Sequence, residues 1–175
     1  DELRKFAMNS FTPGASLVEI VVDLAHRLAS NFTLTPLRRT SKDGMLHALN
    51  HGRGTVKDLA HLFIGALRSM GLAARYLTGY VFADGVGKVH SWAALWVPTG
   101  GWVHIDPSTG SLVDHRYVVL GWGRDTWDVI PLRGVVFGDT VGIRPDVQVW
   151  MEELDPELAE ERSIELRTAL SPGAV

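Results

Sequence analysis

Residues 55–82 read TVKDLAHLFIGALRSMGLAARYLTGYVF, and the change of pattern inside this stretch decides the fold class. Thr55 and Asp58 have the Thr-x-x-acid spacing of a capping box, which marks the start of a helix. Gly71 is typical of a helix end. The residues between them include an apolar set at three- and four-residue spacing: Leu59, Leu62, Phe63, Ala66, Leu67 and Met70. From residue 73 the run becomes rich in β-branched and aromatic residues, so the stretch predicts a helix followed by a strand.

The flanking sequence continues this division. Ser16 and Glu19 form a second capping box before a helical pattern over 17–30, and a shorter helix is expected over 43–50. After the long helix, short β-rich runs separated by turn sequences cover residues 73–82, 89–97, 101–106 and 116–122. Helices first and strands afterwards predict an α+β domain, with N-terminal helices packed on an antiparallel β-sheet.

The C-terminal part carries weaker signals. Residues 146–151 read DVQVWM, which predicts a last strand. Asp155 and Pro156 then suit the cap and first turn of a polar helix over 156–169. We therefore expect a core over residues 1–152 and a helical extension with a tail over 153–175.

Composition limits the classes of function. With 175 residues, 46% of them hydrophobic, the chain has the size and composition of one globular domain. A net charge of -3 without blocks of like charge argues against nucleic-acid and membrane partners. No apolar run approaches the roughly 18 residues of a membrane span, and we expect a cytoplasmic protein. The absence of cysteine excludes disulfides, thiolate metal sites and thiol nucleophiles.

The hairpin of residues 89–97 and 102–106 holds the first candidate site. If Trp96 faces Trp102, the two-residue period puts His90 and Asp106 on one face as diagonal neighbours. A carboxylate in this position orients an imidazole and raises its basicity for proton transfer. Spacing alone favours a structural polar pair at the end of a sheet over a catalytic one.

The start of the long helix is the second candidate site, because backbone N–H groups there stabilise negative charge. Val56 falls on the edge of the apolar stripe and is expected to face the sheet. Lys57 and His61 fall on the opposite side of the helix, where His61 either faces solvent or is buried against another layer. Thr55 is expected to serve as the helix cap.

Three spaced motifs together resemble bacterial transglutaminase-like proteins, a branch of the papain-like cysteine enzymes. They are GRGTVKDLAHLFIGALRSMGLAARYLTGYVF at 52–82, HSWAALWVPTGGWVHIDPSTG at 90–110 and GRDTWDVIPLRGVVFG at 123–138. The likeness extends from residue 1 to about 150. It implies a papain-like fold in which the long helix meets the His90 face of the sheet. It also implies that related proteins often carry a β-rich region before this core.

The resemblance also implies a Cys-His-Asp triad, which this chain does not complete. The histidine of the family motif falls on His90 and the aspartate on Asp106, but the cysteine falls on Val56. Valine has no lone pair with which to attack a carbonyl carbon, so thiol-dependent acyl transfer is not expected. Lys57 stands where the family usually has glutamine, which adds a positive charge beside the pocket.

Two hypotheses follow. The first is a non-catalytic binding domain for a peptide, an amine, an acyl ligand or a partner protein, lined by Thr55, Val56, Lys57 and Trp92. The second is a thiol-independent hydrolase or acyltransferase with His90 as base and Asp106 as its orienting group. No hydroxyl side chain is well placed to replace the missing cysteine as the nucleophile. Thr55 is a helix cap, Ser91 faces away from His90, and Ser108 and Thr109 lie in a turn.

No cofactor or metal is expected. His47 and His51, and the group His90, His104 and Asp106, have ligand-type side chains, but neither forms a recognisable metal motif.

The hairpin tryptophans have two expected roles. Packing in the core is the commoner role for Trp92, Trp96 and Trp102, and lining a groove is the alternative. The other face of the hairpin is wholly apolar, so we expect both faces of the sheet to be covered; it carries Ala93, Leu95, Val97, Val103 and Ile105.

Overall fold

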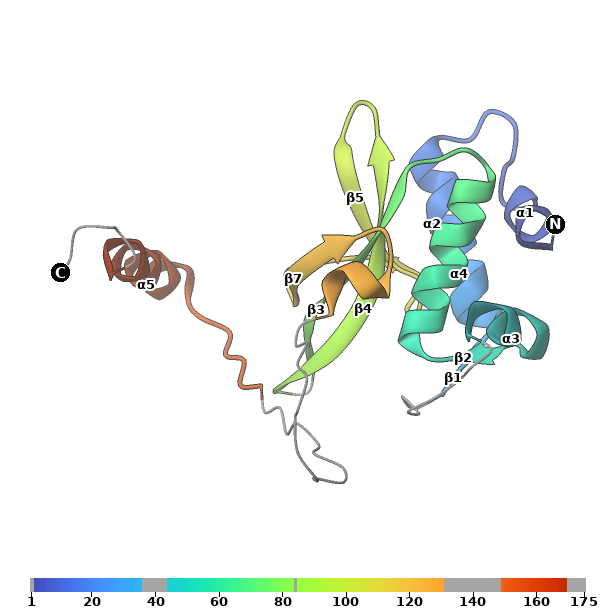
Figure 1. The fold of residues 1–175 in the computed structure, drawn as a ribbon. Coiled ribbons are helices and arrows are strands. Elements are labelled where there is room, and N and C mark those ends of the chain that lie inside the picture. Colours follow the sequence, from blue (N-terminus) through green and yellow to red (C-terminus); the bar gives the residue numbers. More distant parts are fainter. Residues whose placement is uncertain (1, 36–43, 84, 131–148, 170–175) are drawn as a thin grey trace, which may run out of the picture.

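The structure, a computed structural model, describes residues 2–35, 44–83, 85–130 and 149–169. The helices are α1 (Glu2–Met8), α2 (Leu17–Asn31), α3 (Gly44–His51), α4 (Val56–Ser69), the short 3-10 helix η1 (Thr126–Val129) and α5 (Pro156–Ala169). The strands are β1 (Thr33–Leu34), β2 (Arg53–Gly54), β3 (Ala74–Ala83), β4 (Val86–Val97), β5 (Gly101–Asp106), β6 (Ser111–Leu112) and β7 (Tyr117–Gly123). Helices α1 to α4 gather on one side of the sheet, whereas α5 lies apart from both layers (Figure 1). The predicted α+β fold is confirmed.

Both predicted capping boxes are present. The Ser16 hydroxyl accepts the Glu19 N–H at 3.3 Å, and the Glu19 carboxylate accepts the Ser16 N–H at 2.7 Å. At the start of α4, the Thr55 hydroxyl accepts the Asp58 N–H at 3.3 Å, and Asp58 accepts the Thr55 N–H at 2.8 Å. Each box satisfies two N–H groups that a helix start leaves without partners, which explains why α2 and α4 begin where the sequence predicts.

The main sheet has five antiparallel strands in the order β6-β5-β4-β3-β7. The predicted hairpin register is confirmed, since Trp96 pairs with Trp102 and Ala94 with His104. The run predicted over 116–122 forms β7 and returns to pair with β3. The sequence analysis did not identify the two-residue strands β6, β1 and β2, of which β1 and β2 pair in parallel.

The helical layer covers the apolar face of the sheet. Ala93, Leu95 and Ile105 are fully buried in one core with the inner residues of α2 and α4. The His90 face instead carries a second, smaller cluster of Leu77, Trp92 and Ala94. The expectation that the long helix meets the His90 face is therefore wrong. Small and aliphatic side chains at every second position let α4 approach the face opposite to His90.

Two further expectations concern side chains. Of the two positions left open for His61, the buried one is correct, because its ring stacks on Tyr76 of β3 at 4.8 Å. The helix is packed between the sheet and other helices, so a residue outside the main apolar stripe still meets a neighbour. Trp96 and Trp102 are not core residues, since they are 44% and 36% exposed, and the sheet is only partly covered on their face.

The C-terminal predictions have mixed outcomes. The helix predicted over 156–169 is confirmed as α5. The strand predicted over 146–151 is not formed at residues 149–151, which have irregular backbone, and 146–148 lie outside the described residues. The boundary expected after residue 152 stays a prediction. None of the described helices is long and apolar enough to span a bilayer.

Candidate functional site

His90 and Asp106 form the centre of the site. Strand β4 pairs with β5 only as far as Ala93, which lies opposite Ile105. The part of β4 before Ala93 extends beyond β5, and His90 lies in this extension. Its Nε2 lies 2.7 Å from Asp106 Oδ2, and the side chains are 13% and 1% exposed. The diagonal pairing derived from strand alternation therefore exists as a direct, nearly buried hydrogen bond.

Asp106 receives three further hydrogen bonds. The backbone N–H and the hydroxyl of Ser108 donate to Oδ1 at 2.8 and 2.7 Å. The hydroxyl of Tyr117 donates to Oδ2 at 2.8 Å. Burial opposes ionisation of this carboxyl group, but the hydrogen bonds from His90, Ser108 and Tyr117 outweigh it and lower the pKa of Asp106. The carboxylate is therefore held in its charged form.

The bond to Asp106 determines which nitrogen of His90 is available. Because the carboxylate accepts a hydrogen bond from Nε2–H, a neutral His90 carries its lone pair on Nδ1. No described residue forms a hydrogen bond with that atom. Nδ1 can therefore accept an N–H or O–H group of a ligand or take a proton from it.

Aromatic rings hold His90 in place. Trp92 is fully buried and stacks on His90 with ring centroids 6.3 Å apart. Tyr117 meets both rings edge-on, at 5.8 Å from His90 and 5.3 Å from Trp92. The burial of Trp92 confirms the expected core role, so Trp92 supports His90 and does not line the ligand pocket, which was the alternative.

The start of α4 supplies the remaining predicted residues. Thr55 caps the helix, and its hydroxyl also donates to Asp58 at 2.8 Å, so its polar atoms are engaged locally. Val56 and Lys57 are half-buried at the first turn. The carbonyl oxygen of Lys57 lies 2.9 Å from His61 Nδ1.

His61 links α4 to the sheet. Its Nε2 lies 3.3 Å from the Thr126 hydroxyl of η1, and its ring stacks on Tyr76. Burial lowers the pKa of His61, which favours a neutral ring in this position. The Tyr76 hydroxyl donates at 2.7 Å to Ser91, the residue after His90. Ser91 thus faces away from His90, as predicted.

Two residues of the site were missed from the sequence, Ser108 as a partner of the carboxylate and Tyr117. Tyr117 of β7 reaches Asp106 across β3 and β4, and Gly79 of β3 lies opposite His90 on the neighbouring strand. A Cβ atom at Gly79 would lie 2.7 Å from the Trp92 ring and 1.9 Å from the Val118 carbonyl oxygen. Only glycine fits here, and the glycine in the run at 73–82 was the one available signal of this close packing.

The sequence matches the transglutaminase-like superfamily over residues 5–107. The chain belongs to the transglutaminase-like superfamily. Uncharacterized proteins from Mycobacterium tuberculosis and Mycobacterium bovis are each 38% identical over 162 residues. These matches cover 85% of this chain and 52% of each relative, so the chain spans about half the length of the curated relatives it matches.

Solved structures agree with the transglutaminase-like assignment. A cysteine protease-like protein from Cytophaga hutchinsonii superposes with a TM-score of 0.62 and 26% identity, over 73% of this chain and 44% of that chain. The periplasmic domain of TgpA from Pseudomonas aeruginosa shares the fold, with a TM-score of 0.51 and 24% identity over 62% of this chain and 42% of that chain. This transglutaminase-like chain contains no cysteine.

Metal-ligating side chains do not converge in the described part of this transglutaminase-like domain. Its described residues contain no group of three or more His, Asp or Glu arranged to hold a metal ion. His47 and His51 stack on each other with ring centroids 4.0 Å apart on α3. His104 faces Trp92, whose indole N–H lies 3.5 Å from its Nδ1.

Proposed function

We propose that this transglutaminase-like domain is a pseudoenzyme that binds a peptide, amine or acyl ligand beside His90. The observation that carries the proposal is a His90–Asp106 pair at 2.7 Å in a chain without cysteine. A thiolate nucleophile is required to form a thioester intermediate, and no residue of this sequence can supply one.

The second wall of the ligand site is proposed from the family resemblance alone, because α4 packs on the face of the sheet opposite to His90 and no described contact joins the start of α4 to His90. The resemblance assigns the nucleophile position to Val56, whose aliphatic side chain offers only an apolar contact. Lys57 adds a positive charge at the same turn, and Thr55 caps the helix. On the opposite side, His90 Nδ1 would accept the N–H group of an amine or amide.

Thiol-independent hydrolysis is the second candidate, and the state of His90 favours it. Asp106 is held ionised and leaves the lone pair of Nδ1 without a described partner, which is the arrangement of a general base acting on water. Ser108 does not replace the thiol, because its hydroxyl donates to Asp106 at 2.7 Å. Water would therefore be the nucleophile.

A mass-spectrometric assay separates the two candidates. Wild type, His90→Ala and Val56→Cys are incubated with glutamine peptides, acyl thioesters and amines. Binding without catalysis predicts no turnover by wild type and a covalent acyl adduct on Val56→Cys. Val118→Cys is the matched control, because it places a thiol on an exposed strand position away from the start of α4.

The other outcomes are equally decisive. Turnover by wild type that disappears in His90→Ala would establish the thiol-independent enzyme and overturn the pseudoenzyme. Adduct formation at equal rates on Val56→Cys and Val118→Cys would show that the start of α4 is no acyl site. The ligand that acylates Val56→Cys would then be titrated into wild type by calorimetry, with His90→Ala expected to bind more weakly.

A further inference from the structure

Arg75 occupies an unusual position on the exposed part of the His90 face. It lies on β3 opposite Ala94, whose small side chain leaves room above the sheet. The central guanidinium carbon is 4.1 Å from the ring centroid of Trp102 and 4.6 Å from that of Trp122. Because β5 and β7 lie on opposite sides of β3 in the sheet, the two indoles approach Arg75 from opposite sides.

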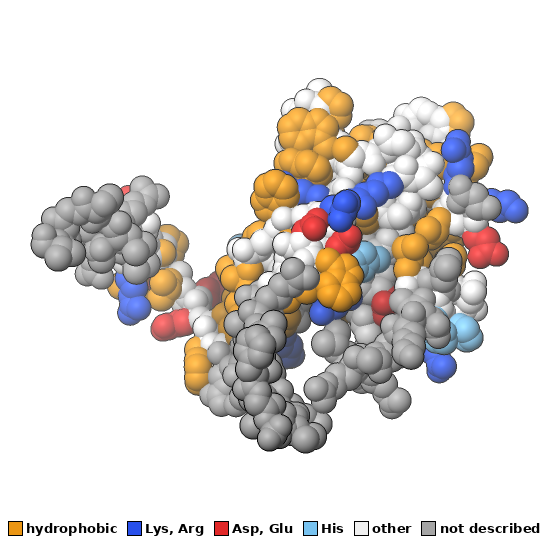
Figure 2. Space-filling view, viewed as in Figure 1, with side chains coloured by type: hydrophobic (Ala, Val, Ile, Leu, Met, Phe, Trp, Pro, Cys, Tyr) orange, Lys and Arg blue, Asp and Glu red, His pale blue; other side chains and the backbone are white. Residues whose placement is uncertain are grey.

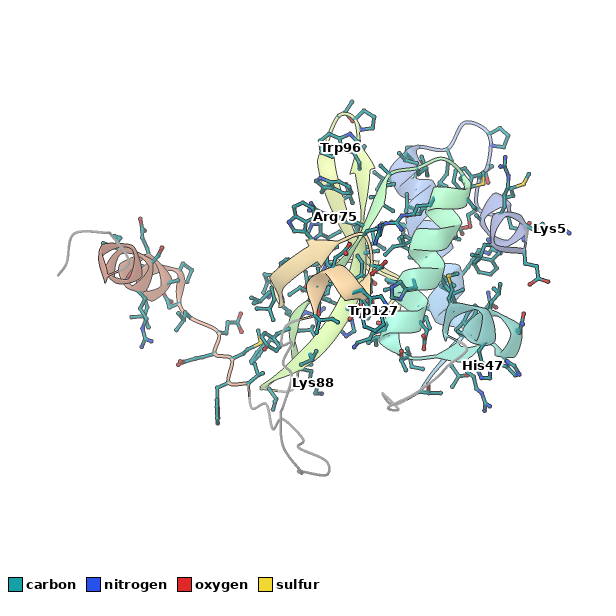
Figure 3. The ribbon with its side chains drawn as sticks, viewed as in Figure 1. Lys5, His47, Arg75, Lys88, Trp96 and Trp127 are labelled. Atoms are coloured by element: carbon teal, nitrogen blue, oxygen red, sulfur yellow. The ribbon has the colours of Figure 1, made fainter. Side chains whose placement is uncertain are left out.

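The indoles around Arg75 are open to solvent. Trp122 is 61% exposed, and Trp96 packs edge-on against Trp102 with centroids 5.5 Å apart. Hydrophobic side chains gather over the β4–β5 hairpin (Figure 2), and Arg75 lies on β3 below Trp96 at the hairpin end (Figure 3). We call Arg75, Trp96, Trp102 and Trp122 the tryptophan–arginine platform.

The charge of Arg75 is not matched by the described part of the protein. No described carboxylate lies within 4.0 Å of its guanidinium group, and its Nε is buried without a hydrogen-bond partner. Burial also lowers the pKa of Arg75. His104, which lies across Ala94 from Arg75, is no counter-ion, because an imidazole is neutral or positively charged; burial and the charge of Arg75 lower its pKa. A partly buried cation without a described counter-ion attracts an anion.

The geometry selects the kind of anion. Two indole rings lie close to the central carbon of the guanidinium group, and no described residue forms a hydrogen bond with its terminal nitrogens, which we take as the ligand-binding edge. A carboxylate binds such an edge through two parallel N–H···O bonds. Indole rings lie on both sides of the cation, so each can contact one apolar neighbour of an acidic residue inside a peptide. A C-terminal carboxylate has a neighbouring residue on one side only and would use one of the two indoles.

We propose that the tryptophan–arginine platform is a docking site for an extended peptide in which an acidic side chain is flanked by apolar residues. The carboxylate binds the edge of the Arg75 guanidinium group, and the flanking side chains pack on Trp96 with Trp102 and on Trp122. The platform uses neither His90 nor the start of α4, so it stands independently of the pseudoenzyme proposal.

NMR titration of the indole N–H signals tests the platform. The probes are acetyl-Leu-Glu-Leu-amide and its neutral isostere acetyl-Leu-Gln-Leu-amide, with Trp127, exposed on η1, as the internal reference. The glutamate peptide is expected to shift the three platform indoles and to bind about ten-fold more tightly than the glutamine peptide, since a charged hydrogen bond is lost. Added salt should weaken its binding.

Variants assign the binding to particular side chains. Arg75→Lys keeps the charge but loses the planar edge, and Trp122→Ala removes one exposed flank, so each should weaken the glutamate peptide several-fold. Trp127→Ala is the matched control and should leave its affinity unchanged. Trp122→Ala keeps the test valid if a change at Arg75 disturbs folding.

Three results would overturn the proposal. Equal affinity for the glutamate and glutamine peptides would exclude recognition of the carboxylate. Tighter binding of acetyl-Leu-Ala-Leu with a free C-terminal carboxylate would show that the platform recognises chain ends. No shift of the platform indoles at about 10 mM peptide would show that the platform is not a docking site for such a segment.

Discussion

The hydroxyl of Tyr117 donates to Asp106 Oδ2 at 2.8 Å, although the two residues lie on strands separated by β3 and β4. The tyrosine side chain spans β3 and β4 and packs edge-on against His90. This contact ties β7 to the centre of the candidate site. It also completes the hydrogen bonding of a carboxylate that is only 1% exposed.

Replacement of Tyr117 by phenylalanine is expected to lower the free energy of unfolding by about 2 kcal/mol, because a hydrogen bond to a buried charge is lost. The pKa of Asp106 should rise towards its ordinary value. Urea denaturation measures the first effect and NMR titration the second. Tyr80→Phe is the matched control on β3, since no described residue bonds its hydroxyl. An equal effect of both variants would show that the bond to Asp106 contributes nothing.

Stability should depend on pH through Asp106. Its pKa is lowered by folding, so as the pH falls the unfolded chain takes up the proton first. The contribution of Asp106 is therefore complete above the ordinary aspartate pKa of about 3.9 and is lost as the pH falls through the folded value. The difference in unfolding free energy between wild type and Asp106→Asn should shrink in this acidic range. A difference that stays constant down to about pH 3 would contradict the assignment.

A second pH effect is expected from His61. Burial lowers its pKa, so the unfolded chain binds the proton first, and stability falls as the pH drops from about 6.5 through the folded value. NMR titration should give a midpoint below that of an unfolded histidine. His61→Phe keeps an aromatic ring on Tyr76 and removes the titration, so its stability curve should be flatter over this range. A normal midpoint would refute the buried, neutral state.

Gly79→Ala should be strongly destabilising. The added Cβ atom would lie 1.9 Å from the Val118 carbonyl oxygen, a backbone atom that cannot move aside without disturbing the β3–β7 pair. We expect a loss of about 2–3 kcal/mol of unfolding free energy. Gly100→Ala is the matched control, because its Cβ atom would meet nothing within 4 Å, and its effect should be within about 0.5 kcal/mol. Similar effects of the two substitutions would contradict the described packing.

The central pair of the candidate site could be predicted from local rules. Strand alternation and the hairpin register place His90 and Asp106 on one face, and both follow from residues close in sequence. Tyr117 could not be found in this way, because its contact depends on the return of β7 beside β3. The same holds for Trp122 and Arg75, which meet only after the five strands are ordered.

The sequence by itself determined the helix starts, the α+β class, the hairpin register and the absence of a thiol nucleophile. These properties depend on capping spacing, periodicity and composition, which act within a few residues or do not depend on shape at all. The tertiary structure decided that α4 packs on the face opposite to His90, that His61 meets Tyr76, and that Trp96 and Trp102 stay exposed. Periodicity tells two faces of a strand apart, but only long-range packing determines which face another layer covers.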